Sequence, residues 1–275
     1  MLRMPEPVLV LDLFPAEREA LLVLLESLPA DDWSRPTIAG SWTVKDIAAH
    51  LMADDLGRVS SQRDGHLETW VPADEPLAAY IDRRNAEWVA AMRRLSPRVV
   101  RSLLEFSGQE TQQQFTSMDP FALGWSVGWV GPDPVPNWLD MAREFTERWH
   151  HQQQIREAVG TPLLDDLMFL KPVLATFAFA LVPPFRSVDA SSDTTVQLTV
   201  EGFAGGQWSV IREGSGWALR VGRTDAPTAS VSMDQDTAWR MYVRALDRAE
   251  IEGRSRLEGD VRLAARILDA FGLVS

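Results

Sequence analysis

The 275-residue sequence contains no cysteine. This absence excludes structural disulfides, zinc sites built on thiolates and a cysteine nucleophile. Any thiol chemistry would therefore need a thiol supplied by a small molecule. Histidine is also scarce, because the whole chain holds only His50, His66, His150 and His151. A site that needs imidazole groups must be built from these four residues.

Positive charge is in short supply. Lysine and arginine together number 27 against 39 acidic residues, so the formal net charge is -12 and the pI is about 4.8. This balance argues against nucleic acid and anionic membrane surfaces as partners. Residues 1–7 lack the apolar core of a signal peptide. The most apolar run, residues 167–184, is interrupted by Lys171 and Pro172, so we expect no membrane span and a cytoplasmic protein.

The first two thirds of the chain have mainly helical periodicity. The spacing of apolar residues, the capping signals and the prolines predict helices over residues 13–28, 75–95, 137–159 and 164–182. They also predict a helix that begins at residue 43 and ends in the polar run 60–65, and a weaker helical segment that ends near residue 105. Residues 109–136 are rich in glutamine, glycine, tryptophan and proline. We expect this segment to form a long ordered loop or hairpin that covers a pocket.

The last third of the chain has a different pattern. Short β-branched or alternating runs predict strands over residues 194–202, 207–213, 217–222, 229–233 and 251–257, and helical periodicity predicts helices over 234–246 and 260–271. Two glycine-containing tight turns join the first three strands. We therefore expect a helical domain at residues 1–185 and a small α+β domain with a mainly antiparallel sheet at residues 186–275.

A carboxylate and an imidazole lie four residues apart in the predicted helix that begins near residue 137. Glu147 and His151 would share one side of that helix, with their Cβ atoms roughly 5–6 Å apart. Two such groups can bind one divalent metal ion if a third ligand comes from elsewhere in the chain. His150 competes with His151 for this role, because it lies three residues from Glu147.

Two histidines could supply the third ligand. Thr43 and Asp46 form a capping-box pattern, and the helix that they begin carries His50 on the flank of its apolar face. His66 follows a polar run that reads as the end of a helix and a loop, so His50 is better placed. Two histidines and one carboxylate would leave a coordination position open, as in catalytic metal sites. These ligands suit zinc, and also iron(II), nickel or cobalt.

A simpler interpretation of the Glu147–His151 pair competes with the metal site. A glutamate and a histidine four residues apart often form only a weak pair on the surface of a helix. Glu147 and His151 also lie away from the helix's apolar stripe, which consists of Trp138, Met141, Ala142, Phe145 and Trp149. That placement is awkward for a site in the core of a bundle and acceptable for one at its open end.

Two segments resemble a known family. Residues 40–51, GSWTVKDIAAHL, and the motif Glu147-x-x-x-His151-x-x-Gln154-Ile155-Arg156 resemble the two signatures of the mycothiol-dependent maleylpyruvate isomerase family. That family belongs to the wider group of DinB-like four-helix bundles. Residues 228–239 and 258–274 look like the sterol-carrier-protein-like domain that follows its bundle. The resemblance implies zinc held by His50, Glu147 and His151, and so favours His151 over His150.

The resemblance also implies an activity. We expect a divalent metal, zinc or a similar transition metal, to activate mycothiol or a similar thiol for isomerisation of, or transfer to, a small electrophilic substrate. Arg220 and Arg223, after the third predicted C-terminal strand, are candidate catalytic residues for anionic substrate groups. One residue departs from the pattern, because Gln154 stands where the family has an aspartate. An amide can hydrogen bond there but cannot balance charge.

Two other functions fit the same residues. The three ligands could activate water in a metal-dependent hydrolase. Alternatively, the protein could be a non-catalytic binder whose C-terminal domain holds a small molecule or lipid. In each case we expect a monomer or homodimer whose partners are small molecules, with no nucleic acid and no membrane.

Overall fold

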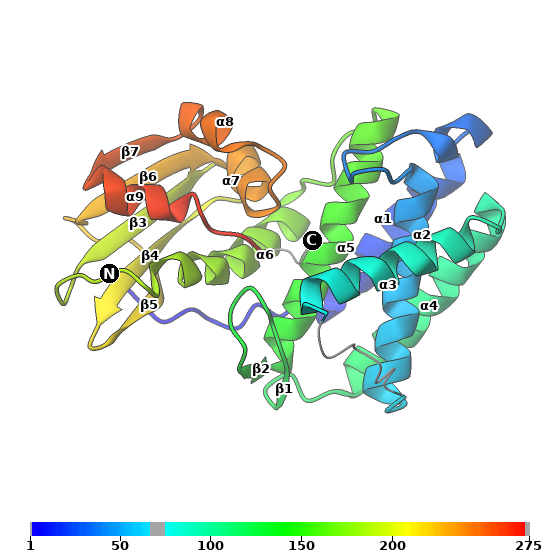
Figure 1. The fold of residues 1–275 in the computed structure, drawn as a ribbon, viewed down its shortest axis with the longest axis horizontal. Coiled ribbons are helices and arrows are strands. Elements are labelled where there is room, and N and C mark those ends of the chain that lie inside the picture. The colour runs from blue at the N-terminus through cyan, green and yellow to red at the C-terminus, as the bar shows by residue number, and fades with distance from the viewer. Residues whose placement is uncertain (1, 67–74, 273–275) are drawn as a thin grey trace. The chain divides into compact units, whose positions relative to one another are not determined.

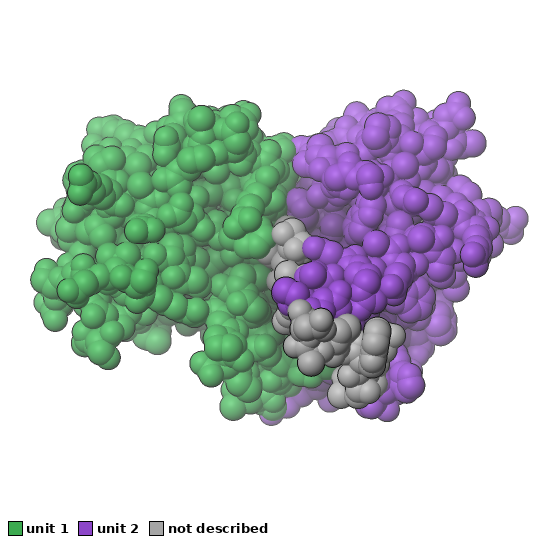
Figure 2. Space-filling model, viewed as in Figure 1, with its two compact units in different colours: residues 1–9, 121–146, 165–274 green, residues 10–120, 147–164, 275 purple. Residues whose placement is uncertain are grey.

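The structure is a computed structural model that describes residues 2–66 and 75–272 (Figure 1). The chain folds into two compact units (Figure 2). The helical unit comprises residues 10–120 and 147–164, and the sheet unit comprises residues 1–9, 121–146 and 165–274. The predicted fold class, a helical N-terminal region followed by an α+β region, is confirmed. The predicted domain boundary near residue 186 stays a prediction.

The helical unit is built from helices of the first two thirds of the chain, where helices were predicted. They are α1 (Phe14–Ser27), α2 (Val44–Arg58), α3 (Leu77–Met92), α4 (Pro97–Ser117) and the second half of α5 (Asn137–Val159). Helix α2 packs against α3 and α4, and α1 packs against α4. Apolar side chains fill the space between them, among them Leu21, Leu25, Ile47, Leu51, Leu104 and Ile155.

The start of α2 is fixed by hydrogen bonds that the sequence predicted. The Asp46 backbone N–H donates to Thr43 Oγ1 at 3.3 Å, and the Thr43 N–H donates to Asp46 Oδ2 at 3.0 Å, which is the expected capping box. Arg93, at the end of α3, adds two hydrogen bonds of 2.9 and 3.0 Å to the Asp46 carboxylate. These bonds hold the first turn of α2 rigidly, one turn before His50.

Helix α4 corrects the expectation of a loop that begins at residue 109. The helix continues to Ser117, and only the residues after it form a hairpin, with strands β1 (Leu123–Ser126) and β2 (Pro134–Pro136). Some of the polar side chains of this segment are buried and hydrogen-bonded inside the helical unit. Thr111 Oγ1 donates to the Ser107 carbonyl at 3.0 Å, and Gln114 Nε2 donates to Gln62 Oε1 at 2.6 Å.

Helix α5 is buried around nearly its whole circumference between Leu139 and Ile155. Trp149 and Ile155 are fully buried, and so are Gln152 and Gln153. The glutamines are tolerated because each is hydrogen-bonded: Gln152 Nε2 donates to Glu17 Oε1 at 2.8 Å, and Gln153 Nε2 donates to the Leu164 carbonyl at 2.9 Å. A single apolar stripe therefore does not define the inward face of α5.

The sheet unit contains a five-stranded sheet in the order β5-β4-β3-β6-β7 within the described residues. Its strands are β3 (Thr195–Glu201), β4 (Gly206–Glu213), β5 (Gly216–Val221), β6 (Ala229–Asp234) and β7 (Arg256–Gly259). The pair β3–β6 is parallel, and every other neighbouring pair is antiparallel. The unit also holds the helices α6 (Leu167–Phe177), α7 (Gln235–Tyr242), α8 (Arg248–Gly253) and α9 (Val261–Ile267).

Local chemistry explains one agreement and one error in this unit. Residues 214 and 215 form the predicted tight turn, since Glu213 pairs with Gly216 and Gly214 has a φ of +55°. The strand predicted over residues 251–257 is present only at its end, as β7, because α8 occupies the first part. Asp247 and Glu250 form a capping box with two bonds of 2.8 Å that begin this helix, and β7 starts only at Arg256.

The apolar segment Leu167–Phe185 also departs from expectation. By length and composition it is apolar enough to cross a membrane, with a mean hydropathy of 1.7 over its best window. The expectation that Lys171 and Pro172 make this segment too polar or too interrupted for a membrane span is therefore not supported by its length and composition. Half of that window is buried inside the protein. Phe177, for example, is fully buried and stacks on Tyr242 with ring centroids 5.2 Å apart, as expected of a core helix.

Candidate metal centre

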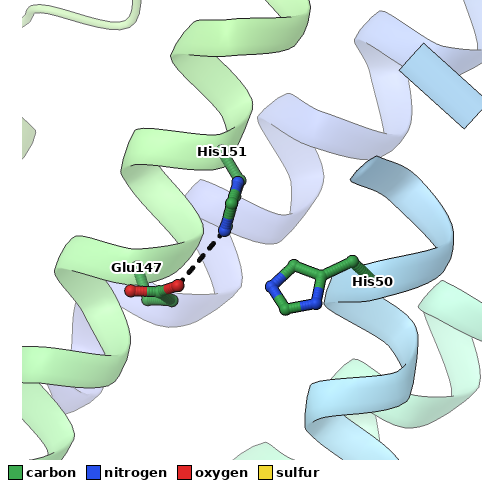
Figure 3. A group of neighbouring side chains, drawn as sticks. All are labelled: His50, Glu147 and His151. Atoms are coloured by element: carbon green, nitrogen blue, oxygen red, sulfur yellow. Dashed lines mark hydrogen bonds and ion pairs between the residues drawn. The ribbon is translucent and has the colours of Figure 1, made fainter. Parts of the chain in front are cut away.

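Three of the side chains singled out in the sequence converge in the helical unit. His50 projects from α2, and Glu147 and His151 project from successive turns of α5 (Figure 3). One ligand atom from each lies within 4.8 Å of the other two. His151 Nε2 and Glu147 Oε1 are 3.2 Å apart. His66 is not part of this group; it is exposed and follows the helical turn that ends at Arg63.

The cluster is largely shielded from water. His50 is 6% exposed and His151 is 8% exposed, while the Glu147 side chain retains 15%. The two imidazole rings meet edge to face with centroids 4.7 Å apart, and Trp42 packs against His50 with centroids 5.0 Å apart. Because α5 is buried on all sides, Glu147 and His151 are enclosed although they lie off its apolar stripe. The position of Glu147 and His151 away from the apolar stripe therefore does not argue against a buried metal site.

Gln154 determines how the imidazole of His151 is protonated. Gln154 Oε1 lies 2.8 Å from His151 Nδ1, and an amide oxygen can only accept, so Nδ1 must carry a proton. The amide nitrogen of Gln154 donates to His150 Nε2 at 2.9 Å. Gln154 thus leaves Nε2 as the atom of His151 that can coordinate a metal. It also hydrogen-bonds to His150, the other histidine that the sequence offered as a ligand.

The surroundings of His151 favour a positive charge at Nε2. Burial alone would lower the pKa of His151, but the hydrogen bond and the negative charge of Glu147 outweigh it, and the net pKa is raised. Both ring nitrogens face acceptor oxygens, since Gln154 lies at Nδ1 and Glu147 at Nε2. Either a proton or a metal ion between Nε2 and Glu147 would satisfy this arrangement.

The donor set fits a divalent transition metal. Ligand atoms bound to one zinc ion at about 2.0–2.1 Å lie roughly 3.4 Å from one another in a tetrahedral site. The separation of 3.2 Å between His151 and Glu147 already matches this value, and the widest separation of 4.8 Å requires a modest inward movement. Gln154 supplies the hydrogen bond to the second ring nitrogen that metal-bound histidines ordinarily have.

A second buried polar cluster in the same unit was not predicted from the sequence. Asp55 on α2 accepts from Arg18 at 2.8 Å, from Arg148 and from Ser107 at 2.8 Å. Burial would raise the pKa of Asp55, but the two arginines hold it below its ordinary value. Charged residues at isolated helical positions look like surface residues in a sequence. Only their convergence across α1, α2, α4 and α5 reveals the cluster.

The two predicted catalytic arginines lie in the sheet unit. Arg220 is on β5, where its guanidinium donates to the Glu213 carboxylate and to the Leu219 carbonyl. Arg223 follows the end of β5. Glu213 already uses part of the hydrogen-bonding capacity of Arg220. The role of both arginines toward a substrate stays a prediction.

Comparisons with known proteins found a family match over the helical part of the chain. The model of the mycothiol maleylpyruvate isomerase N-terminal domain matches residues 14–156, which include all three clustered side chains. The chain belongs to this family. The match ends before the sheet unit's five-stranded sheet begins at Thr195, so the resemblance of that part to a sterol-carrier-protein-like domain stays a prediction.

Two uncharacterised proteins of Mycobacterium tuberculosis, from strains CDC 1551 and H37Rv, are each 26% identical over 147 residues. The match covers 53% of this chain and 54% of each relative. The chain therefore spans about half the length of the relatives that it matches. Among solved structures, the mycothiol-dependent maleylpyruvate isomerase and a histidine-to-alanine mutant of it share the fold. Each has a TM-score of 0.52 at 14% identity, over 84% of this chain and 86% of the other.

Proposed function

We propose that the protein binds zinc or another divalent transition metal through His50, Glu147 and His151. We further propose that it uses the metal to activate mycothiol or a similar low-molecular-weight thiol. The substrate would be a small electrophile, which is isomerised or receives the thiol. The observation that carries this proposal is the convergence of two imidazoles and one carboxylate within 4.8 Å, in a chain of the maleylpyruvate isomerase family. The absence of cysteine agrees with a thiol that comes from outside.

A divalent cation with an open coordination position lowers the pKa of a thiol that binds to it, so that a thiolate is present at neutral pH. The residues of this chain prepare the site for that chemistry. Gln154 holds the His151 proton on Nδ1, which leaves Nε2 for coordination. Glu147 contributes the single negative charge of the ligand set. Trp42 covers one side of His50 and limits the access of water.

The reaction itself follows from thiolate chemistry. In an isomerisation, the thiolate sulfur bonds to one carbon of a cis double bond that is conjugated to a carbonyl group. The bond that remains between the two carbons is single and rotates, and expulsion of the same thiolate restores the double bond in the trans form. In a transfer the sulfur–carbon bond is kept: an adduct to a double bond takes up a proton from solvent, whereas a haloaromatic substrate releases its halogen as halide. We propose small-molecule partners only and a cytoplasmic location.

Metal analysis of the purified protein is the first test. We expect one zinc per chain in the wild type after exposure to micromolar zinc and gel filtration, and loss of that zinc in His151→Ala. His66→Ala is the matched control, since this exposed histidine lies outside the cluster, and it should keep the metal. Absence of metal from the wild type, or full retention in His50→Ala and His151→Ala, would overturn the proposed site.

A screen of thiols then tests the reaction. The zinc-loaded protein is incubated with maleylpyruvate-like and haloaromatic electrophiles, with mycothiol, with another low-molecular-weight thiol, or with neither. Turnover that requires a thiol and is lost in His151→Ala supports the proposal. Metal-dependent turnover that proceeds equally well without any thiol would instead indicate that the same ligands activate water.

A further inference from the structure

Arg84, on α3, is the exception among the arginines that the helical unit buries. It is partly buried, its Nε is enclosed, and neither a hydrogen bond nor an ion pair to it is found within the described residues. A charged group that is removed from water is rarely left without a partner, so Arg84 indicates a partner from outside the chain. The other partly or fully buried arginines described in this unit each bind a carboxylate or an amide: Arg18, Arg58, Arg83, Arg101, Arg148 and Arg156.

The guanidinium of Arg84 borders open space beside α2. Helix α3 packs against α2 (Figure 1), and Arg84 Nη2 lies 3.9 Å from the position that a Cβ atom at Gly57 would occupy. Apart from the nearby backbone of α2, no other heavy atom of the described residues comes within 4 Å of that position. The glycine therefore leaves room for a ligand atom beside this terminal nitrogen, although the Nε atom is enclosed.

Gly57 and His50 face the same side of α2. Seven residues make almost two turns of an α-helix, so the two positions differ by about 20° in direction and lie about 10.5 Å apart along the axis. A thiolate sulfur bound to zinc at His50 would already lie about 2.3 Å from the metal. The remaining distance of roughly 8 Å suits an electrophile of a few carbon atoms whose far end reaches Arg84.

An anionic end of the substrate needs a cation of this kind. Glu147 belongs to the candidate metal centre, and Asp54, one turn after His50, acts electrostatically on His151. These two carboxylates offset the charge of a divalent ion, so the ion by itself attracts a further anion only weakly. A guanidinium binds a carboxylate through two parallel N–H groups, which fix the orientation of the carboxylate as well as its position.

We propose that Arg84 binds a carboxylate of the electrophilic substrate and thereby directs the electrophilic carbon toward the thiol at the metal centre. This inference rests on the proposed function, because it concerns the substrate of that same site. It places the cation for the substrate on α3, in the same unit as the metal centre, whereas the guanidinium of Arg220 donates to Glu213 in the sheet unit. The substrate class is a small electrophile with a carboxylate at the end remote from the metal.

Steady-state kinetics of the zinc-loaded full-length protein test the proposal with two substrates of one shape. The first, cis-4-oxopent-2-enoate, carries a carboxylate, and its carboxamide is neutral; each is supplied with mycothiol, and isomerisation to the trans form is measured. We expect Arg84→Met to raise KM for the carboxylate at least about tenfold, which corresponds to about 1.4 kcal/mol, and to change KM for the carboxamide less than about twofold. Arg84→Lys should recover part of the loss, because it keeps the charge without the planar fork.

Arg83→Met is the matched control. Arg83 precedes Arg84 on the same helix, but it donates to Glu75 and Glu87. Its substitution should leave both KM values within about twofold of the wild type, since it removes only surface ion pairs. An equal rise of both KM values in Arg84→Met, or a rise in neither, would overturn the role of Arg84 while the proposed function stands. Absence of thiol-dependent turnover in the wild type would instead overturn the proposed function and this role together.

The stability of the variants separates substrate binding from a structural role. Because Arg84 has no partner to lose among the described residues, Arg84→Met should retain its zinc and unfold at the urea concentration of the wild type or a higher one. A lower urea midpoint together with loss of zinc would indicate a structural role and contradict the proposal. Gly57→Leu provides a second route, since its side chain fills the space beside Nη2 and should raise KM for the carboxylate at least about tenfold. An unchanged KM in Gly57→Leu would refute the site.

Discussion

The helical unit contains two buried polar clusters. Both take residues from α2 and α5, but they differ in the groups that can carry positive charge. The candidate metal centre takes His50 from α2 and Glu147 and His151 from α5, and the second cluster takes Asp55 from α2 and Arg148 from α5. In the second cluster the positive charges are the guanidinium groups of Arg18 and Arg148, which donate to Asp55. The metal centre consists of two imidazoles and one carboxylate. Its carboxylate contacts the imidazole of His151, which is charged only when it is protonated.

The difference shows how helix geometry separates two functions in adjacent residues. Glu147 and Arg148 are neighbours in the sequence, but successive residues of an α-helix point about 100° apart. One therefore joins the imidazoles and the other reaches Asp55. We expect the cluster that guanidinium groups hold together to act in stability, and we expect the cluster of two imidazoles and one carboxylate to bind a metal ion. Variants of the two clusters should separate these roles.

The largest effect is expected for Asp55→Asn. This substitution leaves Arg18 and Arg148 buried without their shared carboxylate, and removal of one partner of a buried ion pair costs about 3–5 kcal/mol. Chemical denaturation should report a loss of this size. Asp82→Asn, on the exposed side of α3, should change the unfolding free energy by less than about 0.5 kcal/mol. A near-neutral effect of Asp55→Asn would show that the two clusters do not differ as described.

The next largest effect is expected for Glu147→Gln, measured as stabilisation by zinc. Zinc at 100 times its dissociation constant should raise the unfolding free energy of the wild type by about 2.7 kcal/mol. If the substitution weakens zinc binding about a hundredfold, the same zinc concentration should add only about 0.4 kcal/mol. Asp55→Asn should keep the full increment, provided that it is measured where the variant is folded. Equal increments in the wild type and Glu147→Gln would contradict the ligand assignment.

A smaller effect is expected at Gln154, which touches the metal centre without binding the metal. Gln154→Leu removes the acceptor for His151 Nδ1 and should lower zinc affinity about 10–100-fold, as for other groups that orient a ligand. Gln154→Asp keeps an acceptor for His151, cannot donate to His150, and should retain most of the affinity. Competition with a chromophoric chelator measures both. A wild-type affinity in Gln154→Leu would show that the amide does not position His151.

The smallest effect is a pH dependence at Glu17. Its folded pKa is raised above the unfolded value, so the wild type loses stability as pH rises from the unfolded value through the folded one. Glu17→Gln cannot titrate and is free of this loss. The unfolding free energy of the variant minus that of the wild type should therefore increase between pH 4 and pH 8. A difference that falls with rising pH would contradict the raised pKa.

Much of the fold and of the site could be predicted from local signals. The capping box at Thr43 and Asp46 predicts the start of α2, and the turn at Gly214 predicts the pairing of β4 with β5, because these patterns act within a few residues. The spacing of Glu147 and His151 predicts that both lie on one side of a helix. Errors occurred where distant contacts override local preference. The glutamine-rich end of α4 is helical, and Gln114 there packs inside the unit and donates a hydrogen bond to the distant Gln62.

The sequence by itself determined the chemistry that is available: two imidazoles and a carboxylate at helical spacing, no cysteine, and an acidic surface. Only the tertiary structure decided how these groups are used. It buried α5 on every side, placed His50 against His151, and gave Gln154 a hydrogen bond to each of two histidines. It also joined Arg18, Asp55 and Arg148, which are far apart in sequence. The physical reason is that burial and the convergence of side chains arise from packing between helices, which no local pattern records.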